Sequence, residues 1–153
     1  MTTKLAFEVL KKLSGRTLAA AESCTGGGIG AAITAVSGAS KVYKGGVISY
    51  CDQVKNALLG VPKEVLEACG AVSKPVAACM AEGVRDALKA GVAVSTTGLL
   101  GPDGDDRGNP VGTVFIGYAD EKNTLVQEYH LTGSREEIRQ QVICLALELI
   151  LEQ

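Results

Sequence analysis

Ser23 is the residue of this sequence best placed to do chemistry. It follows a short apolar run, Leu18 to Ala21, and it precedes three glycines at 26–28 and an apolar stretch with helical spacing. This pattern predicts a strand, a tight turn and a helix, because glycine permits the unusual backbone angles of such a turn. A hydroxyl held there could be a nucleophile, and the free N–H groups of a helix start could stabilise an oxyanion. The alternative is that Ser23 or Thr25 only caps the helix.

Lys55 is the candidate for the base that would activate this serine. It falls in the first turn of a predicted helix, where a cation opposes the helix dipole and the neutral amine is favoured. A neutral amine can take the proton of a serine hydroxyl. Tyr50, just before that helix, could pass a proton or orient the amine, and Asp52 is predicted to cap the helix. The alternative is an ordinary exposed lysine on a helix surface.

Other residue types offer weaker chemistry. Cys24 is a rival nucleophile, since a helix start lowers the pKa of a thiol, although it could equally be a small buried side chain. His130 is the only histidine and is predicted to lie on the polar face of a strand. The acidic run at 103–106 begins like a calcium loop but has Arg107 and Val114 where the fifth and twelfth ligands belong. We therefore expect no metal, and no P-loop or other cofactor motif occurs.

The elements that must position these side chains alternate along the chain. Helices are predicted over 4–14, 29–36, 52–59, 62–70, 73–90 and 134–151, and strands over 18–21, 42–50, 91–98, 111–119 and 124–131. The last two strands form a hairpin, and a capping box of Ser134 and Glu137 starts the last helix. The longest irregular segment, 98–110, is the kind of loop that often carries function. We expect a single α/β domain over residues 1–153, a three-layer α/β/α fold around a mixed sheet.

Composition excludes several classes of protein. The 153 residues are 46% hydrophobic, which suffices for one packed core. No apolar run is long enough to cross a membrane, and the N-terminus lacks a signal-peptide layout, so we expect a cytoplasmic protein without membrane contact. The net charge is −2, with 15 basic and 17 acidic residues well mixed, which argues against a nucleic-acid partner. Five scattered cysteines indicate reduced thiols.

Four segments, taken together, carry a resemblance to a known family. They read Ala-Glu-Ser-Cys-Thr-Gly-Gly at 21–27, Gly-Gly-Val-Ile-Ser-Tyr at 45–50 running on through Lys55 to Leu-Gly-Val at 59–61, Gly-Ala-Val-Ser at 70–73 with Pro75, and Gly-Pro at 101–102 followed by Pro-Val-Gly-Thr-Val at 110–114. Their order and spacing resemble the C-terminal domain of CinA, the nicotinamide-nucleotide amidohydrolase family. The resemblance covers nearly the whole chain.

The resemblance implies a carboxamide hydrolase that converts nicotinamide mononucleotide to nicotinate mononucleotide and ammonia. It places the family's nucleophilic serine on Ser23, and its lysine and tyrosine on Lys55 and Tyr50. Larger CinA proteins carry an N-terminal domain similar to molybdopterin-binding proteins. A chain of 153 residues has no room for that domain, so we expect the stand-alone form.

The substrate would then be a small nucleotide held by backbone donors and cations. We expect the N–H groups of Thr25, Gly26 and Gly27 to hold the oxyanion, with Gly101 in a second glycine loop near the reacting amide. Arg135 and Arg139, at the start of the last predicted helix, are candidates for the phosphate. The small size and apolar richness favour a homo-oligomer.

Several positions depart from the family pattern, and the altered loop at 100–106 motivates a second hypothesis. Asp52 stands where the family usually has asparagine, and its charge would raise the pKa of a lysine three residues later. Leu100 replaces a small residue and Asp105 a glycine, and both are expected to narrow or charge the pocket. The alternative function is a non-catalytic nucleotide-binding or partner-binding module with the same fold.

Overall fold

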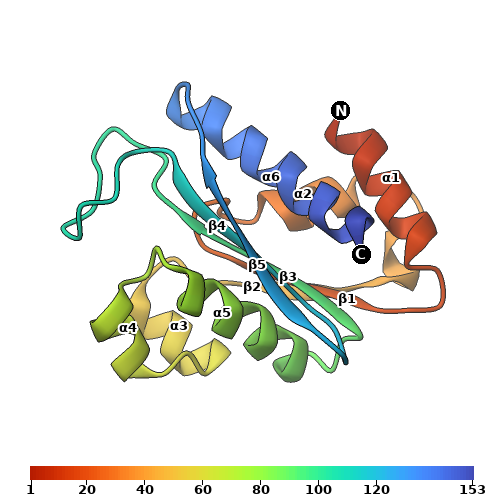
Figure 1. Ribbon diagram of the computed structural model, residues 1–153. Coiled ribbons are helices and arrows are strands. Elements are labelled where there is room, and N and C mark those ends of the chain that lie inside the picture. The colour runs from red at the N-terminus through yellow and green to blue at the C-terminus, as the bar shows by residue number, and fades with distance from the viewer.

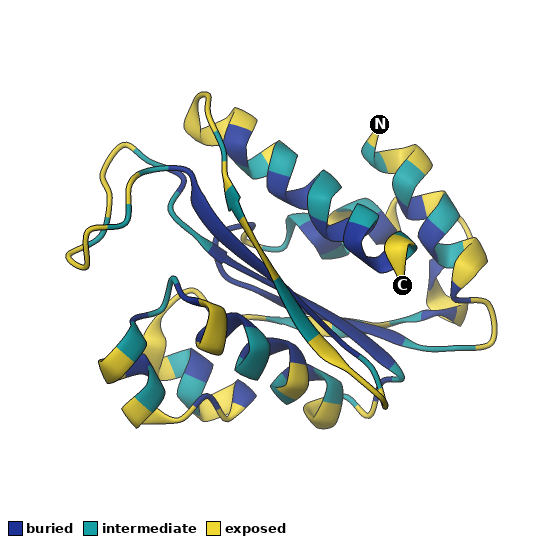
Figure 2. Cartoon of the chain, viewed as in Figure 1, coloured by how far each residue is buried: buried dark blue, intermediate teal, exposed yellow.

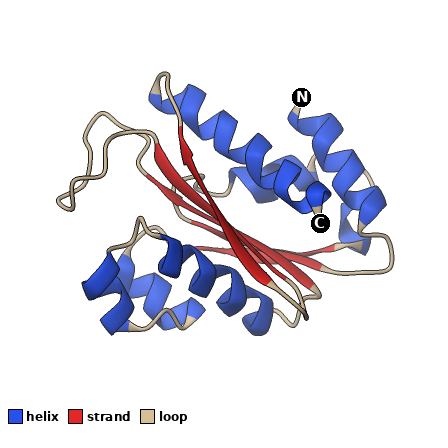
Figure 3. Cartoon of the chain, in the orientation of Figure 1, coloured by secondary structure: helices blue, strands red, loops and turns tan.

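The computed structural model describes all residues from 1 to 153. Helices and strands alternate along the chain (Figure 3). In order, the elements are α1 (Thr2–Lys12), β1 (Leu18–Glu22), α2 (Gly28–Thr34), the short 3-10 helix η1 (Ala39–Lys41), β2 (Tyr43–Ile48), α3 (Asp52–Leu59), α4 (Lys63–Cys69), α5 (Lys74–Ala87), β3 (Val92–Gly98), β4 (Thr113–Ala119), β5 (Thr124–His130) and α6 (Arg135–Glu152).

The five strands form one mixed sheet in the order β2-β1-β3-β4-β5. β1 pairs in parallel with both β2 and β3, whereas β4 pairs antiparallel with β3 and with β5. Helices cover both faces: α1, α2 and α6 lie on one side, and α3, α4 and α5 on the other (Figure 1). The predicted three-layer α/β/α fold with a mixed sheet is therefore confirmed.

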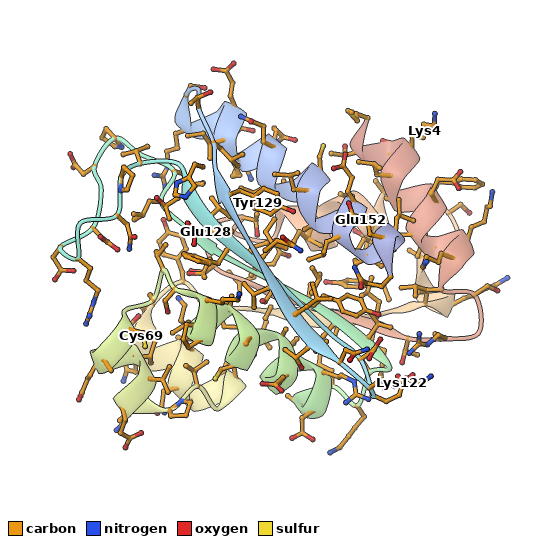
Figure 4. The ribbon with its side chains drawn as sticks, viewed as in Figure 1. Lys4, Cys69, Lys122, Glu128, Tyr129 and Glu152 are labelled. Atoms are coloured by element: carbon orange, nitrogen blue, oxygen red, sulfur yellow. The ribbon has the colours of Figure 1, made fainter.

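Burial follows this layered arrangement (Figure 2). Every residue of β1 and β4 is buried, as are the first six of β3, because helices cover both faces of the central strands. The two edge strands, β2 and β5, alternate or mix exposed and half-buried positions. Tyr129 of β5 packs against the core beneath α6, while its neighbour Glu128 is exposed (Figure 4).

Two hydrophobic cores hold the layers together. The larger lies between the sheet and α1, α2 and α6, and includes Leu18, Ile33, Ile116 and Leu147. The smaller lies between the sheet and α3, α4 and α5 around Met80. None of the helices is both long enough and apolar enough to cross a membrane.

The strand order places a natural binding site at one edge of the sheet. β1 leads through α2 to β2 on one side, and the chain then returns through α3, α4 and α5 to β3 on the other side. The connections leave on opposite faces, so a crevice opens beyond the carboxyl ends of these parallel strands. Ser23, Tyr50 and the loop that begins at Leu99 follow the ends of β1, β2 and β3.

Most local predictions are confirmed, with one error at α3. The hairpin of β4 and β5 is present, and Ser134 and Glu137 form the predicted capping box of α6. Asp52 was expected to cap α3, but Cys51 is the N-cap residue and Asp52 is the first residue of the helix. The Cys51 side chain makes no capping hydrogen bond.

Candidate active site

Ser23 is the first residue after β1, and the sheet fixes its backbone. Its N–H donates to the carbonyl of Thr96 in β3 over 3.1 Å, and its own carbonyl accepts from Gly26 N–H, also over 3.1 Å. The chain turns sharply here, with Gly26 and Gly27 both at positive φ, 59° and 103°. A residue with a side chain would be strained in that conformation, which explains why glycines follow the serine.

Lys55 reaches Ser23 from the other side of the pocket. Its Nζ lies 3.0 Å from Ser23 Oγ and donates to the carbonyl of Ser49 over 2.7 Å. The side chain is only 1% exposed, so the alternative of a solvated surface lysine is wrong. Ser49 is itself tied to the end of β1, since its N–H donates to the Glu22 carbonyl over 2.7 Å.

Burial makes this amine easier to deprotonate. It lowers the pKa of the Lys55 ammonium from its ordinary value of 10.5, because the charged form loses hydration. The Asp52 carboxylate opposes that shift, in the direction expected from the sequence, but the net shift is downward. A neutral Lys55 keeps an N–H for the Ser49 carbonyl and turns its lone pair to the Ser23 hydroxyl.

Glu22 occupies the start of α2. Its Oε1 accepts from the N–H groups of Gly27 and Ile29 over 3.2 and 2.9 Å, and its Oε2 accepts from Gly30 N–H over 3.1 Å. The Thr25 hydroxyl donates to Oε1 over 2.6 Å. A buried carboxylate of this chain, rather than Ser23 or Thr25, therefore caps the helix.

This arrangement corrects the predicted oxyanion site. The N–H groups of Gly26 and Gly27 are already bonded, to the Ser23 carbonyl and to the buried carboxylate respectively. The Thr25 side chain is fully buried. The backbone N–H groups of Cys24 and Thr25, directly after Ser23, make no hydrogen bond to another residue. Of these two residues only Cys24 lines the pocket, because Thr25 is fully buried.

A pocket of about 260 Å³ opens beside the pair of Ser23 and Lys55. Its other walls come from the ends of β2 and β3, the start of α3, the segment before α5 and the first residue of α6. The residues that form these walls are Cys24, Tyr50, Asp52, Ala71, Val72, 97–101, Asp103 and Arg135. The pocket lies at the carboxyl edge of the parallel strands.

Arg135 crosses the mouth of this pocket. Its Nη1 donates to the Gly101 carbonyl over 2.6 Å and its Nη2 to the Tyr50 hydroxyl over 3.1 Å. Tyr50 therefore lines the pocket, but its hydroxyl faces Arg135 and makes no hydrogen bond to Lys55. Arg139 does not line the pocket, because it pairs with Glu136 on the exposed surface of α6, which corrects its predicted place.

Comparison with known proteins decides the family. The model of the CinA C-terminal domain matches residues 2–153. The chain belongs to the CinA C-terminal domain family. It is 48% identical over 132 residues to a CinA-like protein of Gemmatimonas aurantiaca, a match that covers 86% of this chain and 31% of that protein. The chain spans only 31–35% of the length of the curated relatives that it matches.

Solved structures of the CinA superfamily share the fold closely. The competence/damage inducible protein CihA from Agrobacterium tumefaciens has a TM-score of 0.95 at 35% identity, covering 99% of this chain and 94% of that one. The competence damage-inducible protein A from Klebsiella pneumoniae has a TM-score of 0.97 at 31% identity, covering 99% and 96%. These matches confirm the resemblance stated from the sequence.

Cys24 is poorly suited to be the nucleophile of this CinA-family site. Burial raises the pKa of its thiol to about 12, and the thiol belongs to the hydrophobic core. Because the thiolate is the reactive form, a thiol with that pKa is inert near neutral pH. Of the two adjacent candidates, the geometry favours Ser23.

The two unusual loop residues have different effects on the pocket. Leu100 is buried and lines the pocket. Asp105 does not line it. Its Oδ1 accepts from the N–H groups of Arg107 and Asn109 over 3.0 and 2.9 Å, so it folds the loop instead of charging the pocket. The Arg107 guanidinium then donates to carbonyls at the end of α4, including that of Ala68 over 3.1 Å.

The remaining candidates lie apart from the pocket. His130 is exposed on β5 and pairs with Glu128, in agreement with its predicted surface position. The acidic residues at 103–106 do not gather around a common centre, and no group of three or more histidine, cysteine or carboxylate side chains is placed to hold a metal ion.

Sequence reasoning missed several parts of the site. Lys55 is held by the backbone carbonyl of Ser49, and the residue type at position 49 does not predict such a backbone contact. A parallel pairing of β1 with β2 would have placed Ser49 beside Glu22. Asp103 was considered only as part of a calcium loop. Thr97 was seen only as a polar strand end, and the segment 70–73 only as a family motif.

Proposed function

We propose that this chain is a metal-independent amidohydrolase that converts nicotinamide mononucleotide to nicotinate mononucleotide and ammonia. Ser23 is the nucleophile and Lys55 is the base. The observation that supports this most is the 3.0 Å separation of Lys55 Nζ and Ser23 Oγ, with an amine that is buried and has a lowered pKa. A neutral amine beside a serine hydroxyl is the arrangement that a serine nucleophile needs.

The reaction has two stages. Neutral Lys55 takes the Ser23 proton while Oγ bonds to the carboxamide carbon, and the carbonyl oxygen becomes an oxyanion. The protonated amine gives its proton to the leaving nitrogen, the C–N bond breaks, and ammonia departs. Water then attacks the ester while Lys55 accepts a proton from it, and Lys55 returns that proton to Ser23 Oγ as the carbon–Oγ bond breaks. This step releases the carboxylic acid and regenerates the serine hydroxyl and the neutral amine.

Backbone donors and Arg135 would bind the two anionic parts of this substrate. The unbonded N–H of Cys24, which follows the nucleophile directly and belongs to a residue that lines the pocket, is our candidate for the oxyanion. Gly101 helps to shape the wall of the pocket. Arg135 forms no ion pair within the chain and donates only to neutral oxygens, so it is the cation free to receive the phosphate.

Ammonia release from nicotinamide mononucleotide tests the proposal. We expect steady release by the wild type and a loss of about 100-fold or more in Ser23→Ala and in Lys55→Met. Cys24→Ala is the matched control and should retain most of the activity. No release by the wild type, or full release by Ser23→Ala, would end the proposal. A Cys24→Ala protein that alone is inactive would reassign the nucleophile.

The alternative of a nucleotide-binding module without turnover rests on one observation, the buried Leu100 in the pocket wall. Calorimetry that shows binding of the mononucleotide without ammonia release would favour it. In that case Leu100→Ala should restore turnover if the leucine blocks the substrate. Asp105→Gly should not restore it, because Asp105 lies outside this pocket.

We also infer that the protein works as a homo-oligomer in the cytoplasm. β2 is an edge strand with an exposed Ile48, and an open sheet edge can pair with a second copy of the chain. The five cysteines are all free thiols, as expected of a reducing compartment. Light scattering coupled to gel filtration gives the mass in solution, and a monomer at all concentrations would contradict the first inference.

A further inference from the structure

Two carboxylates line the pocket without a cationic partner. Asp52 and Asp103 both contribute to its wall, both are exposed, and neither forms a salt bridge within the chain. Asp52 stands at the start of α3 and Asp103 on the loop after β3, so two separate elements supply negative charge. When Lys55 is neutral, as the proposed mechanism requires, Arg135 is the only cation in the pocket wall that can balance these two negative charges.

An aromatic ring accompanies the two carboxylates. Tyr50 is 63% exposed and lines the pocket. The hydrogen bond from Arg135 holds its hydroxyl, which fixes one end of the ring at the mouth. Aromatic rings and carboxylates both attract cations, and delocalised cations in particular.

We propose that Asp103, with Asp52 and the ring of Tyr50, selects carboxamides carried on a positively charged ring. The inference rests on the proposed function, because the pyridine ring of nicotinamide mononucleotide is permanently cationic through its bond to ribose. The negative wall binds that ring while Arg135 binds the phosphate, so the pocket matches a substrate that carries charges of both signs. Free nicotinamide and the reduced mononucleotide both have a neutral ring and lose the first of these interactions.

A bound cationic ring also affects the base. It would partly cancel the field of Asp52, the group that most strongly raises the pKa of Lys55. The neutral amine is then favoured further once substrate is bound. The pH profile of kcat should therefore rise at a lower pH than that of kcat/KM, since the first reports the complex and the second the free enzyme.

Calorimetry with oxidised and reduced nicotinamide mononucleotide tests this selectivity. Both ligands carry the same ribose, phosphate and carboxamide, and differ in ring charge. Measurements in the Ser23→Ala background avoid turnover. We expect the ratio of the two dissociation constants to favour the oxidised ligand and to fall about two- to fivefold on Asp103→Asn, as for an exposed charge pair. The preference should also weaken with added salt.

Asp106→Asn is the matched control. Asp106 is an exposed carboxylate on the same loop, but it lines only a neighbouring cavity, so its loss should leave the ratio unchanged. A ratio that Asp103→Asn does not alter, or alters no more than Asp106→Asn does, would overturn the inference. If the wild type releases ammonia but Asp103→Asn leaves the ratio of dissociation constants unchanged, the proposed selectivity is wrong and the hydrolase proposal stands. If the ratio falls as expected but no ammonia is released, the hydrolase proposal fails alone.

Discussion

At the scale of single residues, the properties of Lys55 decide whether the site can work. A lysine in water is charged near neutral pH and cannot accept a proton. Here the strand ends hold the amine, since the Ser49 carbonyl accepts one N–H while Ser23 Oγ lies 3.0 Å from Nζ. Burial lowers the pKa of the amine, and the neutral form satisfies both contacts without reorganisation.

Asp52→Asn should shift the pH dependence of activity to lower pH. The proposed mechanism requires activity to rise with pH as Lys55 loses its proton, and the Asp52 carboxylate raises the pKa of that lysine. Removal of the carboxylate therefore lowers the pKa, and the rise of kcat/KM should come earlier. Glu64→Gln, an equivalent change in the first turn of α4, is the control and should leave the profile in place. A shift to higher pH would contradict the assignment of Lys55 as the base.

Lys55→Met should remove a pH-dependent part of the stability. The pKa of Lys55 is lower in the folded protein than the unfolded value of 10.5, so the unfolded state binds more protons between those two values. The contribution of Lys55 is present above pH 10.5 and is lost as the pH falls to the folded pKa. In urea unfolding, the stability of Lys55→Met relative to the wild type should therefore increase as the pH falls through that window. A difference that is constant with pH would contradict a lowered pKa.

The sequence singled out Ser23 and Lys55, but not the contacts that hold the two side chains together. Ser23 could be found because a strand end, three glycines and a helix surround it, and Lys55 because it stands in a first helical turn. The burial of Lys55 could not be read from α3 alone, since it depends on how α3 packs against α5 and on where Ser49 lies after β2. The sequence makes Arg135 and Arg139 equally plausible ligands for the substrate phosphate, but only Arg135 lines the pocket.

At the scale of elements, the start of α2 is held by a negative charge from the preceding strand. Glu22→Gln should destabilise the fold by about 2–3 kcal/mol, because the carboxylate accepts three backbone N–H groups in a buried place. An amide offers one acceptor oxygen and brings an NH₂ group to face N–H donors. Thermal or urea unfolding measures the loss.

Glu137→Gln is the matched comparison for that variant. Glu137 also bonds to a backbone N–H at a helix start, that of Ser134, but it is exposed to solvent. Its loss should therefore destabilise the protein much less. Equal effects of the two substitutions would show that burial of Glu22 is not what makes the cap important.

The packing of α3 against α5 positions the base. Gly83 of α5 faces the carbonyl of Leu59 at the end of α3, and a Cβ at position 83 would collide with that carbonyl. Gly83→Ala should therefore push α3 away, destabilise the fold by about 1–3 kcal/mol and reduce activity by moving Lys55. Gly91→Ala adds the same methyl group where the nearest atom, the Thr17 carbonyl oxygen, is 3.5 Å away, and it should be tolerated. Full activity in Gly83→Ala would contradict this role for the α3–α5 contact.

Elements were predictable where the sequence signal is local. The capping box of α6 and the hairpin of β4 and β5 depend on neighbouring residues, and both were found. The side chain that caps α2 was not predicted, because Glu22 lies before the turn and reaches forward over it to Gly30. The hydrogen bonds between the Glu22 carboxylate and the start of α2 depend on the three-dimensional path of the turn, which the sequence of residue types does not reveal.

At the scale of the whole molecule, the strand order explains why distant segments share one pocket. Ser23, Tyr50 and Leu99 follow three neighbouring parallel strands, so the fold brings their ends to one edge of the sheet. The connection from β1 to β2 and the connection from β2 to β3 lie on opposite faces of the sheet, and a crevice opens beside the end of β1. The sequence predicted the layers of this fold, but the strand order that places the pocket came only from the structure.

The central claim is that Ser23 Oγ attacks the carboxamide. Mass spectrometry of reactions quenched with acid at short times tests it directly. The account predicts a transient adduct on Ser23 with the mass of the mononucleotide less ammonia, absent in Ser23→Ala and formed much more slowly in Lys55→Met. Ammonia release with the adduct on Cys24, or with no adduct on Ser23 at any quench time, would contradict it.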